Sequence, residues 1–430
     1  MMDESYRSWG NLLSTSHTVL RPAFQTVLSE FPSSEPLISY GNGRSYGDVC
    51  QNNNGLICDM RQLDRIIELD EESGVIECQA GVILNDLLKF MVPRGYFIQV
   101  TPGTAYVTLA GMLANDVHGK NHHVKGSFGN HVESFTLLRS DRGILSCSKD
   151  ENSELFYATI GGLGLTGIIL SLRIKLQRIQ NNCIDCKTIK TTGLHELLAQ
   201  FDDVDDKNEY TVSWVDLQSK KIDGLFSSGD HNKVKESCKS PGEPKTIIFD
   251  APEWLLNNMT NKLFNRLYLA KNALGSNSKT GLNTFFYPLD GVANWNRLYG
   301  KRGFYQYQFV VPLSAIEQVF HDLVKIMKKF NQPSYLSVLK KFGDIAPLGM
   351  MSFPRSGYTL AMDFPNKGRS TLEMFNEFDA VIFATDGAIY PAKDARMNRQ
   401  AFEKSFPLCK EFTQYRDKMI ISDFWRRVSG

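Results

Sequence analysis

The stretch YGNGRSYGD, from Tyr40 to Asp48, constrains the fold more than any other part of the sequence. It combines Arg44 and Ser45 with three glycines, Gly41, Gly43 and Gly47. Glycine permits positive φ and lets the backbone approach a ligand closely, and successive N–H groups in such a turn form a concave anion site. The stretch therefore predicts a loop that binds a pyrophosphate, in preference to an ordinary solvent-exposed turn.

A second cluster of small residues follows about 60 residues later. It comprises a Pro-Gly turn (TPGT, Thr101 to Thr104), a helix start around Gly111 (TLAGMLAN, Thr108 to Asn115) and HGKNHH (His118 to His123). The N-terminal amides of a helix bind phosphate. One long cofactor could therefore bridge the two clusters.

A third glycine cluster, GGLGLTG, contains the spacing GxGxxG at Gly162, Gly164 and Gly167. A dinucleotide fingerprint must follow a strand and open a helix. Here the preceding ELFYATI has a helical pattern and the following GIILSLRIKL has a strand pattern, so the order is reversed. A nicotinamide-binding Rossmann site is not expected; these glycines let segments pack closely or admit the edge of a cofactor.

The composition indicates a globular protein of two packed units. The chain has 430 residues, 42% hydrophobic and 22% charged, with a net charge of +1. This balance gives no basic face for nucleic acid, and no apolar run approaches the roughly 18 residues that span a bilayer. The N-terminal MMDESYRSWGNLL lacks the layout of a secretory signal, so a cytoplasmic location is expected.

The predicted elements belong to the α+β class. Runs of β-forming residues between turn residues, and one apolar helical face, predict strands at 56–60, 75–81 and 167–176 and a helix at 82–95. Ser314 with Glu317, and Ser370 with Glu373, have capping-box spacing and predict the starts of two further helices. The stretch VIFATDGAIYPAKDARM, from Val381, reads as strand, turn and strand.

Cysteines and histidines do not form a recognisable metal site in the sequence. Cys183 and Cys186 make one CxxC, but no second pair or histidines at ligand spacing follow, so ordinary thiols are expected. Four histidines lie close together without a carboxylate at helical spacing, so they are expected in a loop and around a cofactor: His118, His122, His123 and His131. No bound metal is predicted.

Several motifs together resemble the decaprenylphosphoryl-β-D-ribose 2-oxidase family: GNGRSYGD, TPGT, DVHGKNHHVKGSFGNHV, ELFYATIGGLGLTGII, WNRLYGKRGFYQYQFVVP, KKFG, DFP and AKDAR. The resemblance runs from Tyr40 nearly to the C-terminus. It implies a two-domain PCMH-type (vanillyl-alcohol-oxidase-like) fold with FAD as the cofactor. The implied domains are an FAD-binding domain at 1–182, an inserted substrate domain at 183–386 and a segment at 387–430 that completes the FAD domain.

The resemblance implies the cofactor residues one by one. They are Gly41, Asn42, Gly43, Arg44, Ser45, Tyr46, Gly47, Gly103, Thr108, Gly111, Asn115, Asp116, His118, Gly119, Ile169 and Tyr390. Many relatives attach the flavin covalently through a histidine soon after the RS motif. Asp48 occupies that place here, so noncovalent FAD is expected.

The implied substrate wall comprises Lys120, Trp295, Gln306, Gln308, Lys340, Phe342, Thr359 and Lys393. Gln306 and Gln308 share one side of a strand because side chains alternate along it. Phe286, Thr359 and Ala361 depart from the family pattern, in which a tyrosine, an asparagine and a cysteine are expected. Inhibitors that capture that cysteine would not react covalently here, because alanine has no nucleophile.

The implied reaction oxidises the 2-hydroxyl of a polyprenylphosphoryl pentose. Lys393 is the first candidate for the proton-handling group, either as a base with a lowered pKa or as a cation; Tyr46 and His118 lie beside the flavin. A short-chain dehydrogenase would reduce the product, completing an epimerisation to arabinose. Two alternatives stay open: oxidation of a soluble sugar, alditol or aldonolactone, and a non-catalytic flavin-binding scaffold.

A lipid substrate implies contact with a membrane. Residues 253–275 form an amphipathic stretch that carries Lys262, Arg266 and Lys271. The pattern fits an interfacial helix or lid at the inner membrane, and equally a helix packed on the substrate domain.

Overall fold

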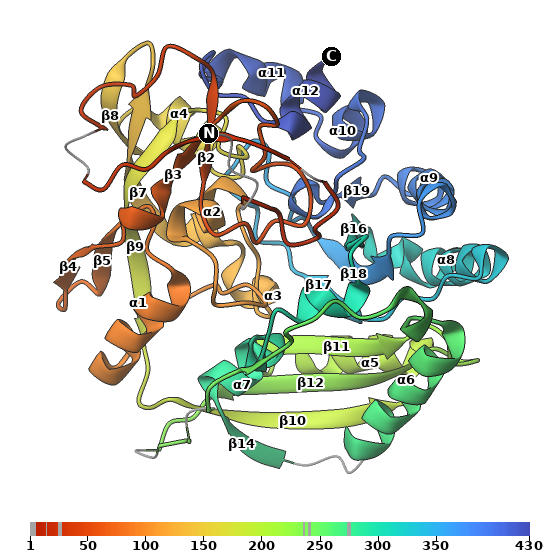
Figure 1. The fold of residues 1–430 in the computed structure, drawn as a ribbon. Coiled ribbons are helices and arrows are strands. Elements are labelled where there is room, and N and C mark those ends of the chain that lie inside the picture. Colours follow the sequence, from red (N-terminus) through yellow and green to blue (C-terminus); the bar gives the residue numbers. More distant parts are fainter. Residues whose placement is uncertain (1–5, 14, 25–27, 235–236, 240–241, 273–276) are drawn as a thin grey trace.

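The computed structural model describes residues 6–13, 15–24, 28–234, 237–239, 242–272 and 277–430 (Figure 1). The N-terminal part contains a small parallel sheet in the order β1-β3-β2, formed by β1 (Thr18–Leu20), β2 (Leu37–Tyr40) and β3 (Leu56–Asp59). The Tyr40–Asp48 loop leaves the end of β2 directly. A buried parallel strand therefore holds the start of this loop.

A second, antiparallel sheet follows in the order β4-β5-β9-β7-β8, with β6 paired to β9. Its strands are β4 (Ile66–Asp70), β5 (Val75–Gln79), β6 (Tyr96–Ile98), β7 (Val132–Arg139), β8 (Gly143–Ser148) and β9 (Ile168–Arg178). The predicted strands at 56–60, 75–81 and 167–176 are confirmed. The short helices of this half are α1 (Leu84–Met91), α2 (Leu109–Ala114), α3 (His122–Lys125) and α4 (Ser153–Thr159).

Eight further strands form one sheet, in the order β14-β10-β12-β11-β17-β18-β16-β19, while β13 (Lys245–Thr246) and β15 (Val292–Ala293) pair separately. The eight strands are β10 (Cys183–Thr191), β11 (Tyr210–Asp216), β12 (Asp223–His231), β14 (Asn277–Gly281), β16 (Phe304–Val311), β17 (Ser337–Phe342), β18 (Gly357–Pro365) and β19 (Ala388–Ile389). With the helices, these sheets make an α+β fold, as expected.

Helices cover the two faces of the large sheet unequally. On one face, α5 (Leu194–Val204) packs Phe201 on Phe226, and α9 (Arg369–Phe383) packs Phe375 on Tyr305. The adjacent α8 (Ile316–Phe330) contacts α9. On the other face, α6 (Asn258–Asn272) packs Leu269 against β11 and β12 (Figure 1). The rest of this second face is available to form a site.

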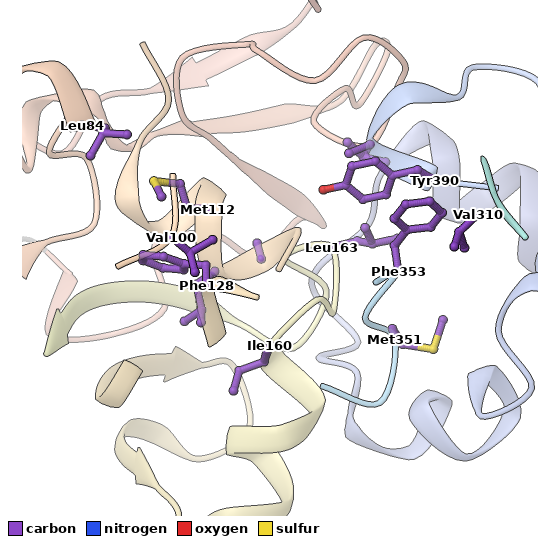
Figure 2. Packing of buried hydrophobic residues seen from close by; sticks show 14 of the residues in the cluster. Leu84, Val100, Met112, Phe128, Ile160, Leu163, Val310, Met351, Phe353 and Tyr390 are labelled. Carbon is purple, nitrogen blue, oxygen red and sulfur yellow. The ribbon is translucent and has the colours of Figure 1, made fainter. Parts of the chain in front are cut away.

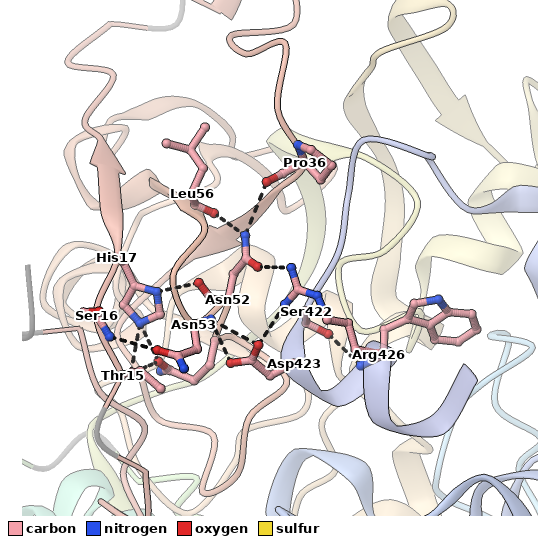
Figure 3. Close-up of polar contacts among 12 residues, drawn as sticks. Thr15, Ser16, His17, Pro36, Asn52, Asn53, Leu56, Ser422, Asp423 and Arg426 are labelled. Carbon is pink, nitrogen blue, oxygen red and sulfur yellow. Dashed lines mark hydrogen bonds and ion pairs between the residues drawn. The ribbon is translucent and has the colours of Figure 1, made fainter. Parts of the chain in front are cut away.

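The C-terminal segment returns to the first sheet. The amide of Leu37 donates to Met419 O, and the amide of Ile421 donates to Leu37 O. Figure 3 shows the adjoining contacts of α12 (Asp423–Ser429), in which Asp423 accepts from the Asn53 amide and Arg426 donates to Asn52. Both asparagines follow the pyrophosphate loop, so the C-terminus fixes the position of that loop.

The largest cluster of buried apolar residues extends through both halves. Figure 2 shows residues of this cluster from both halves: Met112 and Phe128 from the first, and Val310, Phe353 and Tyr390 from the second. The Phe353 and Tyr390 rings stack with centroids 4.5 Å apart. Any cavity between the halves therefore has walls that are held rigidly by packing.

Both predicted capping boxes are wrong, although the two helices are present. Pro312 precedes the 3-10 turn Leu313–Ala315, which places the start of α8 beyond Ser314. Helix α9 starts one residue before Ser370, whose hydroxyl accepts from Gln332 instead. At Ser370 a tertiary partner thus binds the hydroxyl that local spacing assigned to a cap.

Two further predictions are corrected. The segment from Val381 begins as the last turn of α9 and not as a strand, because Ile382 continues the buried helical face of Phe378. Cys183 forms a disulfide with Cys238, 55 residues away, with a Cα–Cα distance of 5.4 Å, so it is not an ordinary thiol. Cys186 is free.

Within the described residues, no helix combines the length and the hydropathy needed to span a membrane. The amphipathic stretch at 253–275 forms a 3-10 turn, Glu253–Leu255, followed by α6. Gly275 lies outside the described residues.

Candidate active site

A cavity of about 1020 Å³ lies between the loops of the first half and the open face of the large sheet. The Tyr40–Tyr46 loop and residues of the 101–120 segment line one side, and β16, β17 and β18 line the other. The cavity then continues past β11 and β12 to α6. Lys393 and Tyr46 meet in this cavity although they are far apart in the sequence.

The Tyr40–Tyr46 loop presents unpaired donors. Within the described parts of the chain, the amides of Asn42, Gly43, Arg44 and Ser45 donate to no protein acceptor. The Nε of Arg44 is buried without a partner, and its guanidinium lies 4.2 Å from the centre of the Trp9 ring. Buried donors are costly unless a ligand supplies acceptors. The loop therefore fits the pyrophosphate of FAD.

Gly103 and Gly47 have different surroundings. A Cβ on Gly103 would meet nothing within 4 Å, and this residue lines the cavity. A ligand can therefore approach its backbone. Gly47 does not line the cavity, and a Cβ there would collide with the carbonyl of Asp394. Gly47 is thus needed for packing of the C-terminal segment against the loop.

The start of α2 forms the next part of the wall. Thr108 caps this helix by accepting from the Gly111 amide, and both residues line the cavity. The Oδ1 of Asn115 is buried without a partner, and the Tyr390 hydroxyl donates to Asn115 O at 2.9 Å. Ile169 of β9 also lines the cavity. An unpaired carbonyl oxygen here fits a ligand that carries N–H or O–H groups.

Three other predicted site residues lie outside the cavity wall. The carboxylate of Asp116 accepts from the Ser127 hydroxyl, the Gly129 amide and the Ser352 hydroxyl, so its acceptors are already occupied. Gly119 packs against Thr101 and Asn121. Phe342 supports the wall from behind, with its ring 4.8 Å from that of His118. These residues hold the site in shape and do not contact its contents.

His118 is a buried, neutral side chain at the centre of the wall. Burial lowers the pKa of its imidazole well below the ordinary value, and nearby Lys340 and Lys393 add to the effect. Its Nε2 accepts from Gln308 at 2.9 Å, and its Nδ1 is buried without a partner. The free Nδ1 is therefore the atom of this ring that is left to donate to a ligand.

Three lysines face the cavity, shielded by protein from bulk solvent. Burial lowers the pKa of Lys120 to about 7, that of Lys340 to about 8 and that of Lys393 to about 7. Lys120 donates to the carbonyl of Phe285. Within the described residues, the ammonium groups of Lys340 and Lys393 have no hydrogen-bond partner. This end of the cavity consequently attracts an anion.

Asp363 adjoins these lysines, although the sequence did not identify it as a site residue. It is fully buried, and burial raises the pKa of its carboxyl group to about 7, opposed by a hydrogen bond from Gln306 and the charge of Lys393. The Nε2 of Gln306 donates to its Oδ1 at 2.6 Å. Asp363 belongs to the DFP motif, which is part of the family resemblance. The sequence alone did not show that Asp363 lies on the same face of the sheet as Gln306.

The sheet register lines up the polar wall. Gln308 of β16 is opposite Ala361 of β18, and Lys340 of β17 is opposite Thr359. The Nε2 of Gln308 also donates to Thr359 at 3.2 Å. Gln306 and Gln308 both line the cavity, as their spacing predicts. A row of hydrogen-bonding side chains thus faces the loops.

Beyond this row an apolar strip lies along the wall, beside the hydroxyl groups of Thr188 and Ser227. Val338 is opposite Trp214, and Trp214 is opposite Leu225, on the same face of the sheet. Phe264 and Tyr268 of α6 close this end. The sequence did not identify Val338, Trp214 and Leu225 as site residues, because only the strand pairing places them beside the polar row.

Aromatic residues fill the sides of the cavity. Trp295 lies 5.5 Å from Trp9 and 5.5 Å from Phe304, between ring centres. Phe286 stacks on Phe97 at 5.1 Å. The adjacent Tyr287 hydroxyl shares a hydrogen bond of 2.6 Å with Thr101. Trp9 belongs to an N-terminal segment that gave no signal in the sequence.

The remaining glycine cluster and Asp48 have distinct positions. Helix α4 precedes GGLGLTG and β9 follows it, which confirms the order that argued against a Rossmann site; Leu163, Gly164 and Gly167 line the cavity. Asp48 is buried outside the cavity wall and pairs with Arg427 at 2.5 Å. In the part of the chain that the structure describes, no group of three or more His, Cys, Asp or Glu side chains could hold a metal ion.

The other clustered histidines also lie outside the cavity wall. His122 packs its ring 4.4 Å from that of Phe342. The Nε2 of His123 is 3.1 Å from Asn208 O, and that of His131 is 2.7 Å from Lys125 O. These three side chains therefore contribute to packing around the cavity and not to its surface.

Comparison with known proteins agrees with this geometry. Residues 25–148 match the family described as "FAD binding domain". The chain is 35% identical to decaprenylphosphoryl-beta-D-ribose oxidase of Mycolicibacterium smegmatis, over 98% of this chain and 96% of that protein. It is 27% identical to an uncharacterized protein of Streptomyces coelicolor over 81% of this chain and all of that protein. It is 28% identical to L-gulonolactone oxidase of Mus musculus, over 88% of this chain and 85% of that protein.

The unpaired loop amides, the open backbone at Gly103 and these matches agree on FAD as the cofactor. The matched oxidases and the polar wall beside the loops indicate oxidation of a sugar-like alcohol. The chain belongs to the decaprenylphosphoryl-beta-D-ribose oxidase family and is an FAD-dependent oxidoreductase.

Proposed function

We propose that this enzyme oxidises the 2-hydroxyl of a pentose carried on a polyprenyl phosphate, giving the 2-keto sugar. One observation carries the proposal: along a single cavity the wall changes from polar and cationic near the pyrophosphate loop to apolar near α6. A substrate made of a sugar, a phosphate and a prenyl chain changes in the same order, from polar and anionic at one end to apolar at the other.

The polar end matches a phosphorylated sugar. The ammonium groups of Lys120 and Lys340 would bind the phosphate, because a buried cation is stabilised by an anionic partner. Gln308 and Thr359 offer amide and hydroxyl groups to the hydroxyls of the pentose. Their hydrogen bonds to one another and to His118 fix their orientation before the sugar binds.

The apolar end matches the start of a prenyl chain. Val338, Trp214 and Leu225 form a continuous strip across three paired strands. Burial of each CH₂ group on such a strip contributes about 0.8 kcal/mol. A free sugar would leave this strip without a partner.

Lys393 handles the proton of the reacting hydroxyl. Bound FAD would supply the hydride acceptor for the carbon that is oxidised. The amine of Lys393 accepts the hydroxyl proton, and its pKa near 7 makes both protonation states accessible at neutral pH. Asp363 and Lys340 influence that pKa in opposite directions through their charges. The protein thus supplies orientation, exclusion of water and one proton acceptor.

FAD is held without a covalent bond in this proposal. Asp48, which stands where many relatives have the histidine that links the flavin, is turned away from the cavity toward Arg427. A carboxylate in a buried ion pair offers no nucleophile to a flavin. Denaturation of the protein should therefore release all of its flavin into the supernatant.

The product defines the class of partner. A 2-keto pentose on a lipid needs a hydride donor to become the epimeric alcohol, so a nicotinamide-dependent short-chain dehydrogenase would complete a conversion of ribose to arabinose for cell-envelope polysaccharide. Both enzymes would act at the cytoplasmic face of the inner membrane.

Oxidation of a soluble sugar, alditol or aldonolactone is the second candidate. The similarity to L-gulonolactone oxidase favours it, as do Phe286, Thr359 and Ala361, which replace the family's side chains in the wall. A non-catalytic scaffold would not require a lysine with a lowered pKa that faces the cavity, as Lys393 does.

Kinetics against chain length test the proposal. Ribosyl phosphate esters with no chain, a C10 chain and a C15 chain are compared with free ribose and alditols. Addition of the C10 chain should raise kcat/KM at least about tenfold, and Val338→Thr, which adds a hydroxyl to the strip, should reduce that gain. Equal kcat/KM values for the esters with and without a chain would contradict the lipid-linked substrate, and faster oxidation of an alditol would support the second candidate.

A further inference from the structure

Helix α6 buries two asparagines and exposes most of its large apolar side chains. Asn261, Asn265 and Leu269, spaced four apart, form the buried side of the helix. Met259 is 79% exposed and Leu267 is 62% exposed. The exposed apolar side chains of the helix are Met259, Leu263, Phe264, Leu267 and Tyr268. A surface helix normally has the opposite arrangement.

Specific hydrogen bonds enforce this arrangement. The Nδ2 of Asn265 donates to Asp216 at 2.7 Å, and the Nδ2 of Asn261 donates to Ser334 O at 3.1 Å. Gln218 donates to Asn261 Oδ1. Rotation of the helix to bury its leucines would break these bonds in the interior, at a cost for each unsatisfied group. The outward direction of the apolar side chains is thus built into the packing.

The apolar surface extends to the segment that precedes the helix. Trp254 lies in the 3-10 turn before α6 and is 74% exposed, and Ile248 and Phe249 are also exposed. Exposed apolar residues concentrated in one segment mark an interaction site. We call the exposed apolar residues of α6, with Trp254, the α6 surface.

Positive charge borders the α6 surface. Lys262 and Arg266 are exposed, one turn apart, between the apolar strip and the buried side of the helix. Lys271 is exposed near the end of the helix, and α6 contains no Asp or Glu. Exposed apolar residues flanked by Lys and Arg are typical of helices that lie in the interface of an anionic bilayer.

The α6 surface is continuous with the cavity. Phe264 and Tyr268 belong to both, because they are exposed and line the apolar end. The Tyr268 ring lies 5.0 Å from that of Trp214, centre to centre, and Leu269 packs on Trp214 and Leu225. The apolar path from the polar wall therefore opens at this helix.

We propose that the α6 surface docks on an anionic lipid bilayer, with α6 lying in the plane of the interface and the mouth of the cavity against the lipid. The choice of a bilayer over a protein partner rests on the basic border and, through the cavity, on the proposed function. Lys262 and Arg266 contact lipid phosphates, while Met259, Leu263 and Leu267 enter the acyl region. A prenyl chain then passes from the bilayer into the cavity without crossing water.

Vesicle sedimentation tests the docking. The FAD-loaded protein should bind vesicles of phosphatidylcholine and phosphatidylglycerol (7:3), and bind pure phosphatidylcholine more weakly. Leu263→Gln with Leu267→Gln, and separately Lys262→Glu with Arg266→Glu, should each lower the partition coefficient at least about tenfold. The matched controls are Ile144→Gln, an exposed apolar residue on β8, and Lys149→Glu with Lys418→Glu, which should both bind as the unchanged protein does.

Trp254 provides a direct reporter of depth. Of the five tryptophans, it is the one with a largely exposed side chain. Brominated lipids should quench its fluorescence when the protein binds, and Trp254→Phe should abolish most of that quenching. Quenching that is undiminished in a variant with both Trp254→Phe and Trp214→Phe would place another face of the protein on the membrane and overturn the proposal.

Other outcomes are equally decisive. Absence of binding by the folded, flavin-loaded protein would overturn the docking. So would a dimer that the Leu263→Gln, Leu267→Gln variant converts to monomers, since a second copy would then cover the α6 surface. That variant should oxidise a water-soluble C10 ester at the unchanged rate. Vesicle binding without oxidation of any ester would refute the proposed function alone, whereas oxidation without vesicle binding would refute the docking alone.

Discussion

The ammonium nitrogen of Lys393 lies 3.9 Å from the centre of the Tyr46 ring. Tyr46 ends the pyrophosphate loop, and Lys393 ends the 3-10 turn Pro391–Lys393 of the C-terminal segment. The Tyr46 amide donates to Ala392 O, so the backbones of the two segments are also joined. A lysine held on an aromatic face beside the flavin loop is positioned to act on a hydroxyl that reaches the same point.

Substitution of Lys393 should stop turnover without loss of flavin. Lys393→Met removes the proton acceptor, and Lys393→Arg leaves a cation that does not release its proton. Both should lower kcat by about 10²–10⁴-fold, while the visible spectrum still shows bound FAD. Near-normal kcat in Lys393→Arg would instead assign an electrostatic role to this position.

The pH profile should rise through neutrality. Burial lowers the pKa of Lys393 to about 7, so the neutral amine is the major form above that pH and the protonated form is the major one below it. The value of kcat/KM should therefore increase from pH 6 to 8 and then level off. Asp363→Asn removes a negative charge that raises this pKa, so the rising limb should move to lower pH. If the rising limb of the Asp363→Asn profile stays at the same pH, the charge of Asp363 does not influence the pKa of Lys393.

Gly103 and Gly47 should respond differently to alanine. Gly103→Ala places a methyl group in open space on the cavity wall, so folding should be unaffected and FAD affinity should fall about tenfold, or ~1.4 kcal/mol. Gly47→Ala collides with Asp394 and should lower the melting temperature of the apoprotein. Equal melting temperatures for both apoproteins would contradict this distinction.

Ala361 should determine resistance to thiol-capturing ligands. It lines the cavity between Gln308 and Val338 and has no nucleophile. Methyl methanethiosulfonate should leave this position unmodified in the natural sequence and modify it in Ala361→Cys, as read by peptide mass mapping. Cys186, a free thiol on the same cavity wall, serves as an internal reference for accessibility.

The bonds under α6 should contribute measurably to stability. Asn265→Ala leaves Asp216 without its 2.7 Å donor and should cost about 1–3 kcal/mol of unfolding free energy in urea. Lys262→Ala, on the exposed side of the same helix, should change it by less than about 0.5 kcal/mol. If the two variants lose the same unfolding free energy, the hydrogen bonds under α6 do not stabilise the helix and its apolar contacts alone hold it.

Local signals predicted the elements that line the FAD side. The glycine loop, the small-residue start of α2 and β9 all follow from short-range patterns, since turns and alternating strands are determined by neighbouring residues. The two capping boxes failed because Pro312 and Gln332, which are not part of those motifs, changed the local partners.

The arrangement of the substrate side could not be predicted from the sequence, because it depends on contacts between residues that are far apart in the chain. Asp363 and Gln306 are 57 residues apart, and their contact follows from the register of β16 with β18. The same applies to the disulfide of Cys183 with Cys238. For α6 the sequence was compatible with an interfacial helix or lid and with a helix packed on the substrate domain. The buried side chains of Asn261 and Asn265 show which side of that helix faces the protein.

Anaerobic spectroscopy of the purified enzyme tests the central claim most directly. Addition of farnesylphosphoryl ribose should bleach the absorption band of the oxidised flavin in proportion to the substrate added, and free ribose or an alditol should leave it unchanged. Bleaching by the alditol and none by the lipid-linked ribose would contradict the account.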